Sequence, residues 1–375
     1  MKIFVIIPTY NEKENIRNLI KVLTEEIFPK INNHEMGILV VDGQSPDGTG
    51  KVVEELSKKY PNVHLIPEPA KRGLGAAYIF GMTEAIEKFG AEAFFEFDAD
   101  FSHDPKLIPD FIKKLDDGAD FILGSRYIKG GSIPGNWGLH RKLLSVFGNL
   151  FINIVFWHRQ IHDWTSGYRL IRKDTFLKIK ERLGKFSGYT FQIAFLHAAT
   201  HLGAKIAEVP LNFIDRKYGR SKMGTEYFKN ALLYVVKVRF EELKKTTFFK
   251  FLMVGGLGFI INAGLYFIFA RFFLIALWLA NLVSSIFAVF SNFFWNNRWT
   301  FKERKAIGVG EFLVKLIKFY ATSAIGVIFI QTGTIALLEA LFGRSGYMIY
   351  FLLGTALLSI WNFTVYSKVI WRKKS

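Results

Sequence analysis

The sequence predicts an α/β fold with a doubly wound, mostly parallel sheet, followed by amphipathic interface helices and an all-α domain of four transmembrane helices. Short apolar runs alternate with amphipathic stretches up to about residue 245, which is typical of right-handed βαβ units. Polar clusters follow these runs, as expected at the carboxyl ends of parallel strands. After residue 248 the apolar runs lengthen, and each reaches the roughly 20 residues that a bilayer crossing needs.

Five short apolar runs are expected to form the buried strands of the sheet. They cover residues 2–8, 37–41, 63–66, 93–97 and 120–123. Four stretches whose apolar residues have helical spacing lie between or after them. These predicted helices cover residues 12–26, 51–60, 74–89 and 105–115.

Length, charge and cysteine content limit the possible functions. At 375 residues the chain is long enough for two domains. Its net charge of +17 suggests an anionic partner, either nucleic acid or a lipid headgroup surface. The absence of cysteine excludes disulfides and thiolate metal sites. The apolar run before Pro8, residues 3–7, has only five residues, so we expect no signal peptide and an N-terminus that starts inside a cytoplasmic domain.

Four polar clusters follow predicted strands and are expected to line one crevice at the carboxyl edge of the sheet. They are residues 9–12, 42–47, 98–104 and 124–127. In the third cluster, Asp98 and Asp100 are two residues apart and can converge on one side of an extended chain. Paired carboxylates suit Mg²⁺ or Mn²⁺, which usually also bind substrate phosphates. The alternative is a surface turn whose aspartates cap the next helix, and the agreement among the four loops favours the metal.

The nucleotide-binding motifs of other enzyme classes are missing. No G-x-G-x-x-G follows the first predicted strand and no P-loop is present, so dinucleotide oxidoreduction and ATP hydrolysis lack their usual signals. Residues 71–75 (KRGLG) place basic residues and glycines at a predicted helix start, where a phosphate can bind. A solvated loop explains the same residues equally well.

Several motifs occur together and in a fixed order within residues 1–240. They are residues 6–12 (IIPTYNE), 40–42 (VVD), 45–49 (SPDGT), 97–105 (FDADFSHDP), 124–127 (GSRY), 141–145 (RKLLS), 165–169 (TSGYR), 208–210 (EVP) and 216–222 (RKYGRSK). With these motifs the chain resembles glycosyltransferase family 2, and within it the dolichol-phosphate (polyprenyl-phosphate) mannose synthases. The resemblance implies a GT-A, Rossmann-like catalytic domain over residues 1–223. One departure is that Gly43 follows Asp42, where the family usually has a second aspartate.

The resemblance also implies a nucleotide-sugar donor, usually GDP-mannose, and a divalent cation, Mg²⁺ or Mn²⁺. The residues that it assigns to the donor are Pro8, Tyr10, Glu12, Asp42, Asp98, Ala99, Asp100, Arg216 and Lys222. The first four would hold the nucleoside, and the two acidic residues of the D-x-D motif would serve the metal and the diphosphate. Some relatives carry a glutamine ligand at the position of Ser102, which is a weaker metal ligand here. His103 is a candidate to compensate, although a loop histidine is more often a helix cap or a hydrogen-bond donor.

The acceptor that the family uses is a polyprenyl (dolichyl) phosphate, and its chemistry needs cations in place of a general base. A sugar hydroxyl must lose a proton before it attacks. A phosphate is already an anion and needs cationic positioning. The candidate residues for this role are Arg126, Arg141, Ser145, Arg216 and Lys222. The alternative for each cation is an ordinary surface ion pair.

Two basic amphipathic stretches are expected to lie on the membrane surface, with their apolar faces in the acyl region. They are residues 139–156, within the catalytic domain, and an interface helix or linker over residues 224–246. Buried core helices are the alternative, chiefly for the first stretch.

The remaining part of the chain, residues 247–375, is expected to cross the membrane four times. The apolar segments are residues 248–271, 274–295, 317–342 and 347–370. Basic residues gather before the first segment, between the second and third, and after the fourth, so the positive-inside rule makes both termini cytoplasmic. This part resembles the GtrA-like membrane family through residues 251–255 and 292–301. Asparagines in or near the spans form hydrogen bonds between helices or belong to a lipid path; they are Asn262, Asn281, Asn292, Asn296 and Asn362.

Taken together, the sequence predicts a multi-pass membrane enzyme that transfers mannose from GDP-mannose to a polyprenyl phosphate, with inversion, on the cytoplasmic face. The polyprenyl-phosphate-mannose formed would serve glycosylation. The alternatives are glucose transfer from UDP- or GDP-glucose to the same lipid, and a lipid-sugar flippase with an accessory transferase domain. A third alternative, a processive polysaccharide synthase, is not supported, because the Q-x-x-R-W motif of that class is absent from the sequence. Nucleic-acid binding could explain the charge but not four spans, so no nucleic-acid partner is expected.

Overall fold

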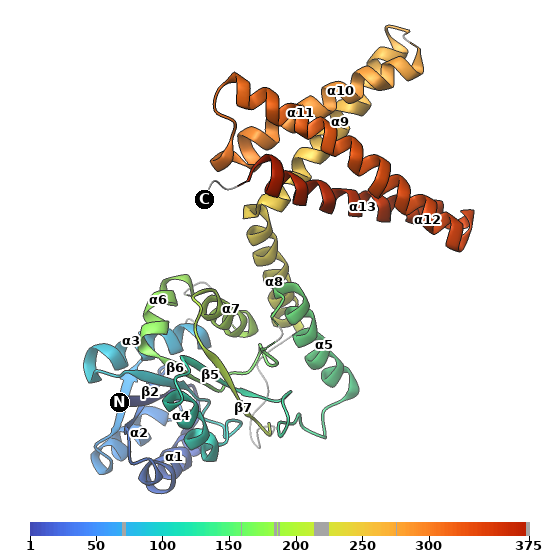
Figure 1. Cartoon of the computed structure of the whole chain (residues 1–375). Coiled ribbons are helices and arrows are strands. Elements are labelled where there is room, and N and C mark those ends of the chain that lie inside the picture. The colour runs from blue at the N-terminus through green and yellow to red at the C-terminus, as the bar shows by residue number, and fades with distance from the viewer. Residues whose placement is uncertain are drawn as a thin grey trace. The chain divides into compact units, whose positions relative to one another are not determined.

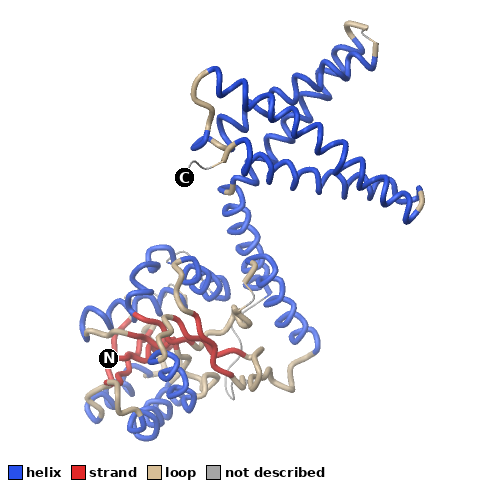
Figure 2. Tube along the Cα trace, in the orientation of Figure 1, coloured by secondary structure: helices blue, strands red, loops and turns tan. Residues whose placement is uncertain are grey.

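The computed structural model describes residues 1–69, 73–158, 160–183, 186, 188–213, 225–274 and 276–372. The chain divides into two compact units, Met1–Arg239 and Phe240–Ser375 (Figure 1). The boundary falls inside helix α8 (Thr225–Lys245), in the segment that the sequence assigns to a linker. In the first unit strands lie among helices, whereas the described second unit consists of helices and their connections (Figure 2).

The first unit is built on a seven-stranded sheet with the order β3-β2-β1-β4-β6-β5-β7. The strands are β1 (Lys2–Thr9), β2 (Glu35–Asp42), β3 (Val63–Pro67), β4 (Ala93–Glu96), β5 (Phe121–Ser125), β6 (Arg169–Arg172) and β7 (Ile206–Pro210). All neighbouring strands are parallel except at β6, which pairs antiparallel with both β4 and β5. The mostly parallel sheet is thus confirmed. Because β6 lies between β4 and β5, these two strands still run in the same direction.

Both faces of the sheet are buried, which explains the continuous apolar runs of its central strands. Alternate residues of β1 enter two separate cores: Ile3 and Val5 contribute to one, and Phe4 and Ile6 to the other. Helices α1 (Lys13–Lys21), α2 (Thr49–Lys59) and α4 (Ile108–Asp116) cover the first face. Helices α3 (Leu74–Phe89), α5 (Leu139–Phe156), α6 (Lys173–Leu183) and α7 (Gly188–His201) pack on the second.

The predicted helices exist, but three of their boundaries were wrong. The helix expected over 12–26 changes after Lys21 into the π-helical turn Val22–Ile27. The second predicted helix begins at Thr49 and not at residue 51, because the preceding Gly48 adopts a left-handed φ of 86° that ends the loop. The helix expected at 105 begins with a 3₁₀ turn, Pro105–Leu107, capped by the Asp104 side chain.

The second unit contains α9 (Thr247–Arg271), α10 (Leu277–Trp295), α11 (Val309–Ile325), α12 (Gly333–Phe342) and α13 (Tyr347–Val365). Within the described residues, three helical segments are long and apolar enough to cross a bilayer: Thr247–Arg271, Val309–Phe342 and Ile349–Ile370. The segment expected at 317–342 therefore starts earlier, at Val309, and it passes through a π-helical turn, Gly326–Thr332. Four spans remain a prediction.

Helices α9 and α10 pack closely where one of them carries a glycine. A Cβ added at Gly258 would lie 2.2 Å from Oδ1 of Asn292, so only glycine fits this crossing. Asn262 of α9 accepts a weak, 3.5 Å hydrogen bond from Ser285 of α10. Two of the asparagines that the sequence singled out thus lie between these helices, while the side chain of Asn281 lies outside the described set.

Candidate active site

Strands β1, β2, β4 and β5 run parallel, so the loops that follow them emerge at one edge of the sheet. Three of these loops contain a non-glycine residue with a left-handed φ: Asn11 at 61°, Gln44 at 57° and Phe101 at 61°. Such a conformation is strained, most of all for a bulky side chain such as that of Phe101, and strain of this kind concentrates at functional sites. The carboxyl edge is therefore the candidate site on backbone geometry alone.

The loops after β1 and β2 are joined by hydrogen bonds centred on Asp42, whose side chain is buried. One carboxylate oxygen accepts from the hydroxyls of Thr9 (2.8 Å) and Ser45 (2.6 Å), and the other accepts from the Ser45 N–H (2.9 Å). The N–H of Asn11 in turn donates to the Ser45 hydroxyl at 3.0 Å. Asp42 thus shapes the loop that the sequence assigned to the nucleoside, with most of its acceptor capacity used inside the protein.

Glu68, directly after β3, was not identified from the sequence. Its side chain is only 5% exposed, and its N–H donates to the Asp42 carbonyl at 2.8 Å. A Cβ added at Gly43 would lie 3.7 Å from Oε2 of Glu68 and 3.5 Å from the ring of Tyr10. The Glu68 carboxylate therefore lies beside Gly43, the position at which the family resemblance implies a second aspartate. The signal available in the sequence was an acidic residue at the end of a predicted strand.

Asp98 and Asp100 lie in the turn after β4. The strand ends at Glu96 and not at residue 97, so both aspartates lie in the turn and their placement does not come from strand alternation. The turn is held by its own polar groups. The Asp98 N–H donates to Nδ1 of His103 at 3.0 Å, and the Ser102 N–H donates to Asp100 Oδ1 at 3.0 Å.

His103 is buried and cannot easily serve as a metal ligand. Because Nδ1 accepts a backbone hydrogen bond, the proton of the neutral ring belongs to Nε2. Nε2 lies 3.9 Å from Asp98 Oδ2, and the ring stacks on Tyr168. Burial lowers the pKa of His103, so the neutral form is favoured. This histidine organises the turn, and the suggestion that it replaces a missing metal ligand is not supported by its geometry.

Tyr78 of α3 contacts one of these two aspartates, Asp98. Its buried hydroxyl donates to Asp98 Oδ1 at 3.0 Å. Burial, followed by the charges of Asp98 and Glu96, raises the pKa of Tyr78 well above its ordinary value, so the phenol keeps its proton. It therefore acts as a fixed hydrogen-bond donor that orients Asp98.

Two buried ionisable side chains lie opposite each other in the sheet, next to the turn that carries the aspartates. Glu96 of β4 and Arg169 of β6 are opposite each other in the antiparallel register, and neither is exposed to solvent. Burial raises the pKa of Glu96 to about 7 and lowers that of Arg169 to about 10. Both pKa shifts arise because burial in the protein disfavours the charged form of each side chain. Glu96 and Arg169 are thus polar residues in an otherwise apolar part of the sheet.

Arg126, directly after β5, is held by a buried carboxylate. Its Nε and Nη2 each lie 2.7 Å from an oxygen of Asp163, and its backbone N–H donates to the same side chain at 3.1 Å. Nη2 also donates to the Thr165 hydroxyl at 2.7 Å. Asp163 is fully buried, so the alternative of a surface ion pair is wrong for Arg126. Nη1 makes no further hydrogen bond within the described part of the chain.

Two further residues predicted for the acceptor lie in or beside α5. The Ser145 hydroxyl is 2.5 Å from the hydroxyl of Tyr127, the residue after Arg126, which brings Ser145 to the β5 loop. The guanidinium of Arg141 lies 3.8 Å from the ring centre of Trp137. The structure thus brings Arg126 and Ser145 together through Tyr127.

Helix α5 has one face in the core and an apolar face in solvent. Gly148, Asn149, Ile152 and Phe156 are buried. The exposed apolar residues are Leu139, Leu143, Leu144, Val146, Phe147, Leu150, Phe151 and Ile154. Since monomeric soluble proteins rarely expose such a continuous apolar patch, this face is expected to contact a membrane or a partner.

The other predicted site residues are distributed as follows. The carboxyl end of β1 carries Pro8 within the strand and Tyr10 and Glu12 just after it. The D-x-D turn contains Ala99 and Ser102, and both are buried. Arg216 and Lys222, as well as Lys71 and Arg72 of the basic loop, lie outside the described residues.

His197 of α7 is a buried titratable group away from this edge. Its ring stacks on Phe156 of α5 with centroids 4.1 Å apart. Burial, together with the nearby charges of His201, His158 and Arg239, lowers the pKa of His197 to about 3. His197 is therefore neutral in the folded protein over the physiological range.

The comparisons with known proteins agree on one family. Residues 4–180 match the glycosyl transferase family 2 model, and residues 250–371 match the GtrA/DPMS transmembrane domain. A dolichol-phosphate mannosyltransferase from Pyrococcus furiosus is 33% identical over 336 residues, which cover 88% of each chain. A polyprenol monophosphomannose synthase from Mycolicibacterium smegmatis is 38% identical over 62% of this chain and 85% of its own. An undecaprenyl-phosphate mannosyltransferase from Micrococcus luteus is 35% identical over 63% of this chain and 93% of its own.

Proposed function

The chain belongs to glycosyl transferase family 2, among the dolichol- and polyprenyl-phosphate mannosyltransferases, and from that premise we propose that it transfers mannose from GDP-mannose to a polyprenyl phosphate on the cytoplasmic face of the membrane. The observation that carries the proposal is the meeting, at one sheet edge, of the Asp98–Asp100 turn with the Arg126–Ser145 group. The first offers hard oxygen ligands for a cation and diphosphate, and the second offers donors for an anionic acceptor.

The D-x-D turn fits a divalent cation. Tyr78 occupies Oδ1 of Asp98, whereas Oδ2 is 3.9 Å from the nearest nitrogen of His103, too far for a hydrogen bond. The Asp98 side chain is 34% exposed, so a diphosphate-bound ion can reach it. Asp98 and Asp100 would hold Mg²⁺ or Mn²⁺, with Ser102 as a weaker third candidate. A bound ion would neutralise the charge that develops on the departing diphosphate.

The donor is assigned to the loops after β1, β2 and β3. Pro8, Tyr10 and Glu12 would contact the nucleoside, and Asp42 would contribute chiefly by holding the loop. The Glu68 carboxylate, beside Gly43, substitutes for the second aspartate that relatives carry. Arg216 and Lys222 are proposed to bind the diphosphate.

The acceptor phosphate approaches from the β5 side. One of its anionic oxygens forms the new bond to C1 of mannose while the bond from C1 to the diphosphate oxygen breaks, so the configuration inverts and GDP leaves with the electron pair. No carboxylate need remove a proton, because the nucleophile is already ionised. Arg126 and Arg141 supply positive charge, and Ser145 supplies a hydrogen bond. The bidentate contact with Asp163 fixes the direction of the Arg126 guanidinium.

The enzyme must reach a lipid phosphate at the height of the headgroups. The exposed apolar face of α5, which also carries Arg141 and Lys142, fits an interfacial helix. The second unit anchors the chain, and we propose four spans with both termini in the cytoplasm.

Purified full-length protein with radiolabelled GDP-mannose, UDP-glucose or GDP-glucose tests the proposal. Each donor is offered with a polyprenyl phosphate or with the matching neutral polyprenol, in the presence of Mg²⁺ or Mn²⁺. We expect label in lipid only with GDP-mannose and the phosphate. Equal transfer to the neutral polyprenol would refute the base-free mechanism, and preferential use of a glucose donor would refute the sugar assignment.

A further inference from the structure

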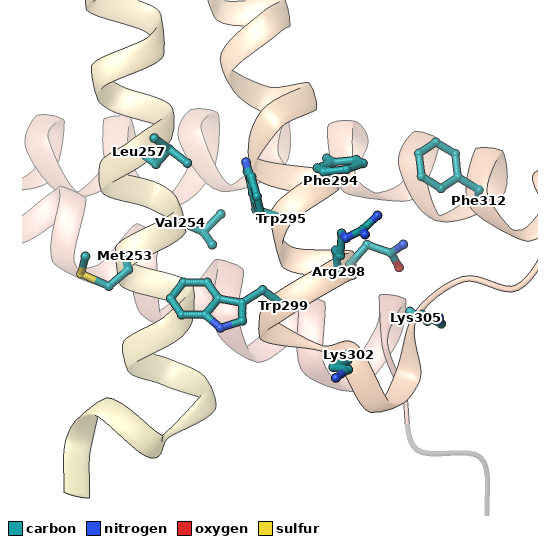
Figure 3. Close-up of a pocket in the computed structure, with 11 residues that line it drawn as sticks. Met253, Val254, Leu257, Phe294, Trp295, Arg298, Trp299, Lys302, Lys305 and Phe312 are labelled. Carbon is teal, nitrogen blue, oxygen red and sulfur yellow. The ribbon is translucent and has the colours of Figure 1, made fainter. Parts of the chain in front are cut away.

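The transmembrane unit contains a cavity of about 940 Å³ that the transfer reaction does not require (Figure 3). Its apolar wall comes from Val254 and Leu257 of α9, which face Trp295 and Trp299 across the space. All of its lining residues belong to the second unit, whereas every proposed catalytic residue belongs to the first.

One side of the cavity is cationic. Arg298, Lys302 and Lys305 line it, all three are exposed, and none of them forms an ion pair or hydrogen bond with another described residue. Two nearby basic residues, Arg304 of the same connection and Lys315 of α11, are engaged. Lys315 pairs with Glu311 at 3.0 Å, and Arg304 donates to the carbonyl of Trp371 at 3.1 Å. The three cationic side chains that line the cavity are thus available to bind an anion from outside the protein.

The position of the cavity suits an amphiphile. Helix α10 ends at Trp295, and the π-helical turn Asn296–Thr300 follows it, so the basic side chains come directly after an apolar segment. Tryptophans are enriched at the membrane–water interface. Basic pockets between transmembrane helices are places where lipid headgroups bind. An anionic head among the cations and an apolar chain along α9 would satisfy both sides of the cavity.

The density of positive charge favours a phosphomonoester. A phosphomonoester carries roughly −1.5 to −2 charges at neutral pH, whereas a phosphodiester carries one. We propose that this cavity binds polyprenyl phosphate, the acceptor lipid, as a second site separate from the catalytic centre; the choice of this lipid rests on the proposed function. The mannosylated product is a phosphodiester, so the site binds substrate in preference to product.

Photolabelling of the full-length protein in nanodiscs tests this inference without any donor present. The probe is a polyprenyl phosphate with a diazirine in its second prenyl unit, and labelled peptides are mapped by mass spectrometry. We expect label on peptides that contain Trp295 or Trp299. The double variant Arg298→Gln/Lys302→Gln should reduce this label by about tenfold, since it removes two charge-assisted contacts.

A matched control changes the same charge elsewhere in the unit. Arg271→Gln/Lys368→Gln replaces two exposed basic residues that do not line the cavity and should leave the label unchanged. If the first double variant does not fold, Lys302→Gln/Lys305→Gln probes the same cationic side. Unlabelled polyprenyl phosphate should compete, while phosphatidylglycerol and polyprenyl-phosphate-mannose should compete at least severalfold less. Unchanged labelling in the cavity variants, or equal competition by phosphatidylglycerol, would overturn the inference.

The failure of this inference can be distinguished from the failure of the proposed function. Mannose transfer to a short, water-soluble prenyl phosphate is measured on the same preparations. Normal cavity labelling without transfer would refute the proposed function and support the lipid site. Normal mannose transfer, together with photolabelling that is the same in the cavity variants as in the wild type, would refute the lipid site alone.

Discussion

The ion pair between Arg126 and Asp163 allows a quantitative test. In Asp163→Asn, a buried guanidinium that now has two 2.7 Å contacts to a carboxylate loses its counter-charge. Removing one partner of a buried pair typically costs about 3–5 kcal/mol. For a unit of 239 residues, each kcal/mol lowers Tm by roughly 2–4 °C. We therefore expect Tm of the first unit to fall by about 6–20 °C.

The assay is thermal unfolding of the full-length protein in detergent, with hydrogen exchange of β1–β5 peptides to identify which unit unfolds. The control is Glu55→Gln, the same carboxyl-to-amide change in the exposed pair with Arg17, whose atoms are 3.5 Å apart. Exposed pairs contribute about 0–1 kcal/mol, so this control should shift Tm by no more than about 4 °C. Equal shifts for the two variants would refute the reasoning.

A compensating variant separates stability from catalysis. Replacing a buried ion pair by apolar residues of similar volume is often neutral or stabilising. Arg126→Met/Asp163→Leu should therefore regain much of the lost Tm while remaining inactive in transfer. An active double variant would show that Arg126 has a structural role only.

Three further predictions concern single side chains. Asp100→Asn should lower kcat/KM by at least about 100-fold, because the cation loses a charged ligand, and near-normal rates with Mg²⁺ or Mn²⁺ would contradict the metal site. Glu68→Gln should weaken donor binding by about tenfold, as measured by calorimetry with GDP-mannose; unchanged affinity would remove Glu68 from the site. His197 has a folded pKa of about 3 against about 6.5 when unfolded, so its contribution to stability is complete above pH 6.5 and falls by about 1.4 kcal/mol for each pH unit below it. The decrease in Tm from pH 7.5 to 5.5 should thus be smaller in His197→Gln than in the wild type, and equal decreases would contradict the assignment.

Much of the first unit was predictable because its pattern is local. The five predicted strands correspond to β1–β5, since each is a short apolar run followed by turn residues. The last two strands, β6 and β7, were not predicted. β6 has only four residues, two of them arginines, and it becomes a strand because β4 and β5 leave a space between them. Such a long-range pairing has no signal in the surrounding sequence.

The site was predictable where residue type and spacing were sufficient. Asp98 and Asp100 could be found in this way, although the turn that joins them could not. Asp163 and Glu68 were missed because their importance depends on what lies beside them: a guanidinium 37 residues earlier in one case and the vacant side-chain position of Gly43 in the other. Partners of this kind are fixed by the tertiary fold.

The exposed apolar face of α5 has a consequence for synthesis of the chain. The first residue of α9, Thr247, comes 37 positions after the last residue of β7, Pro210. At about 5–20 residues per second, the ribosome needs roughly 2–7 s for this interval. Sheets of mixed topology can form in that time. The first unit can therefore expose the apolar face of α5 to water for seconds before α9 emerges from the ribosome. During translation, α5 is the segment that needs a chaperone or an early encounter with the bilayer.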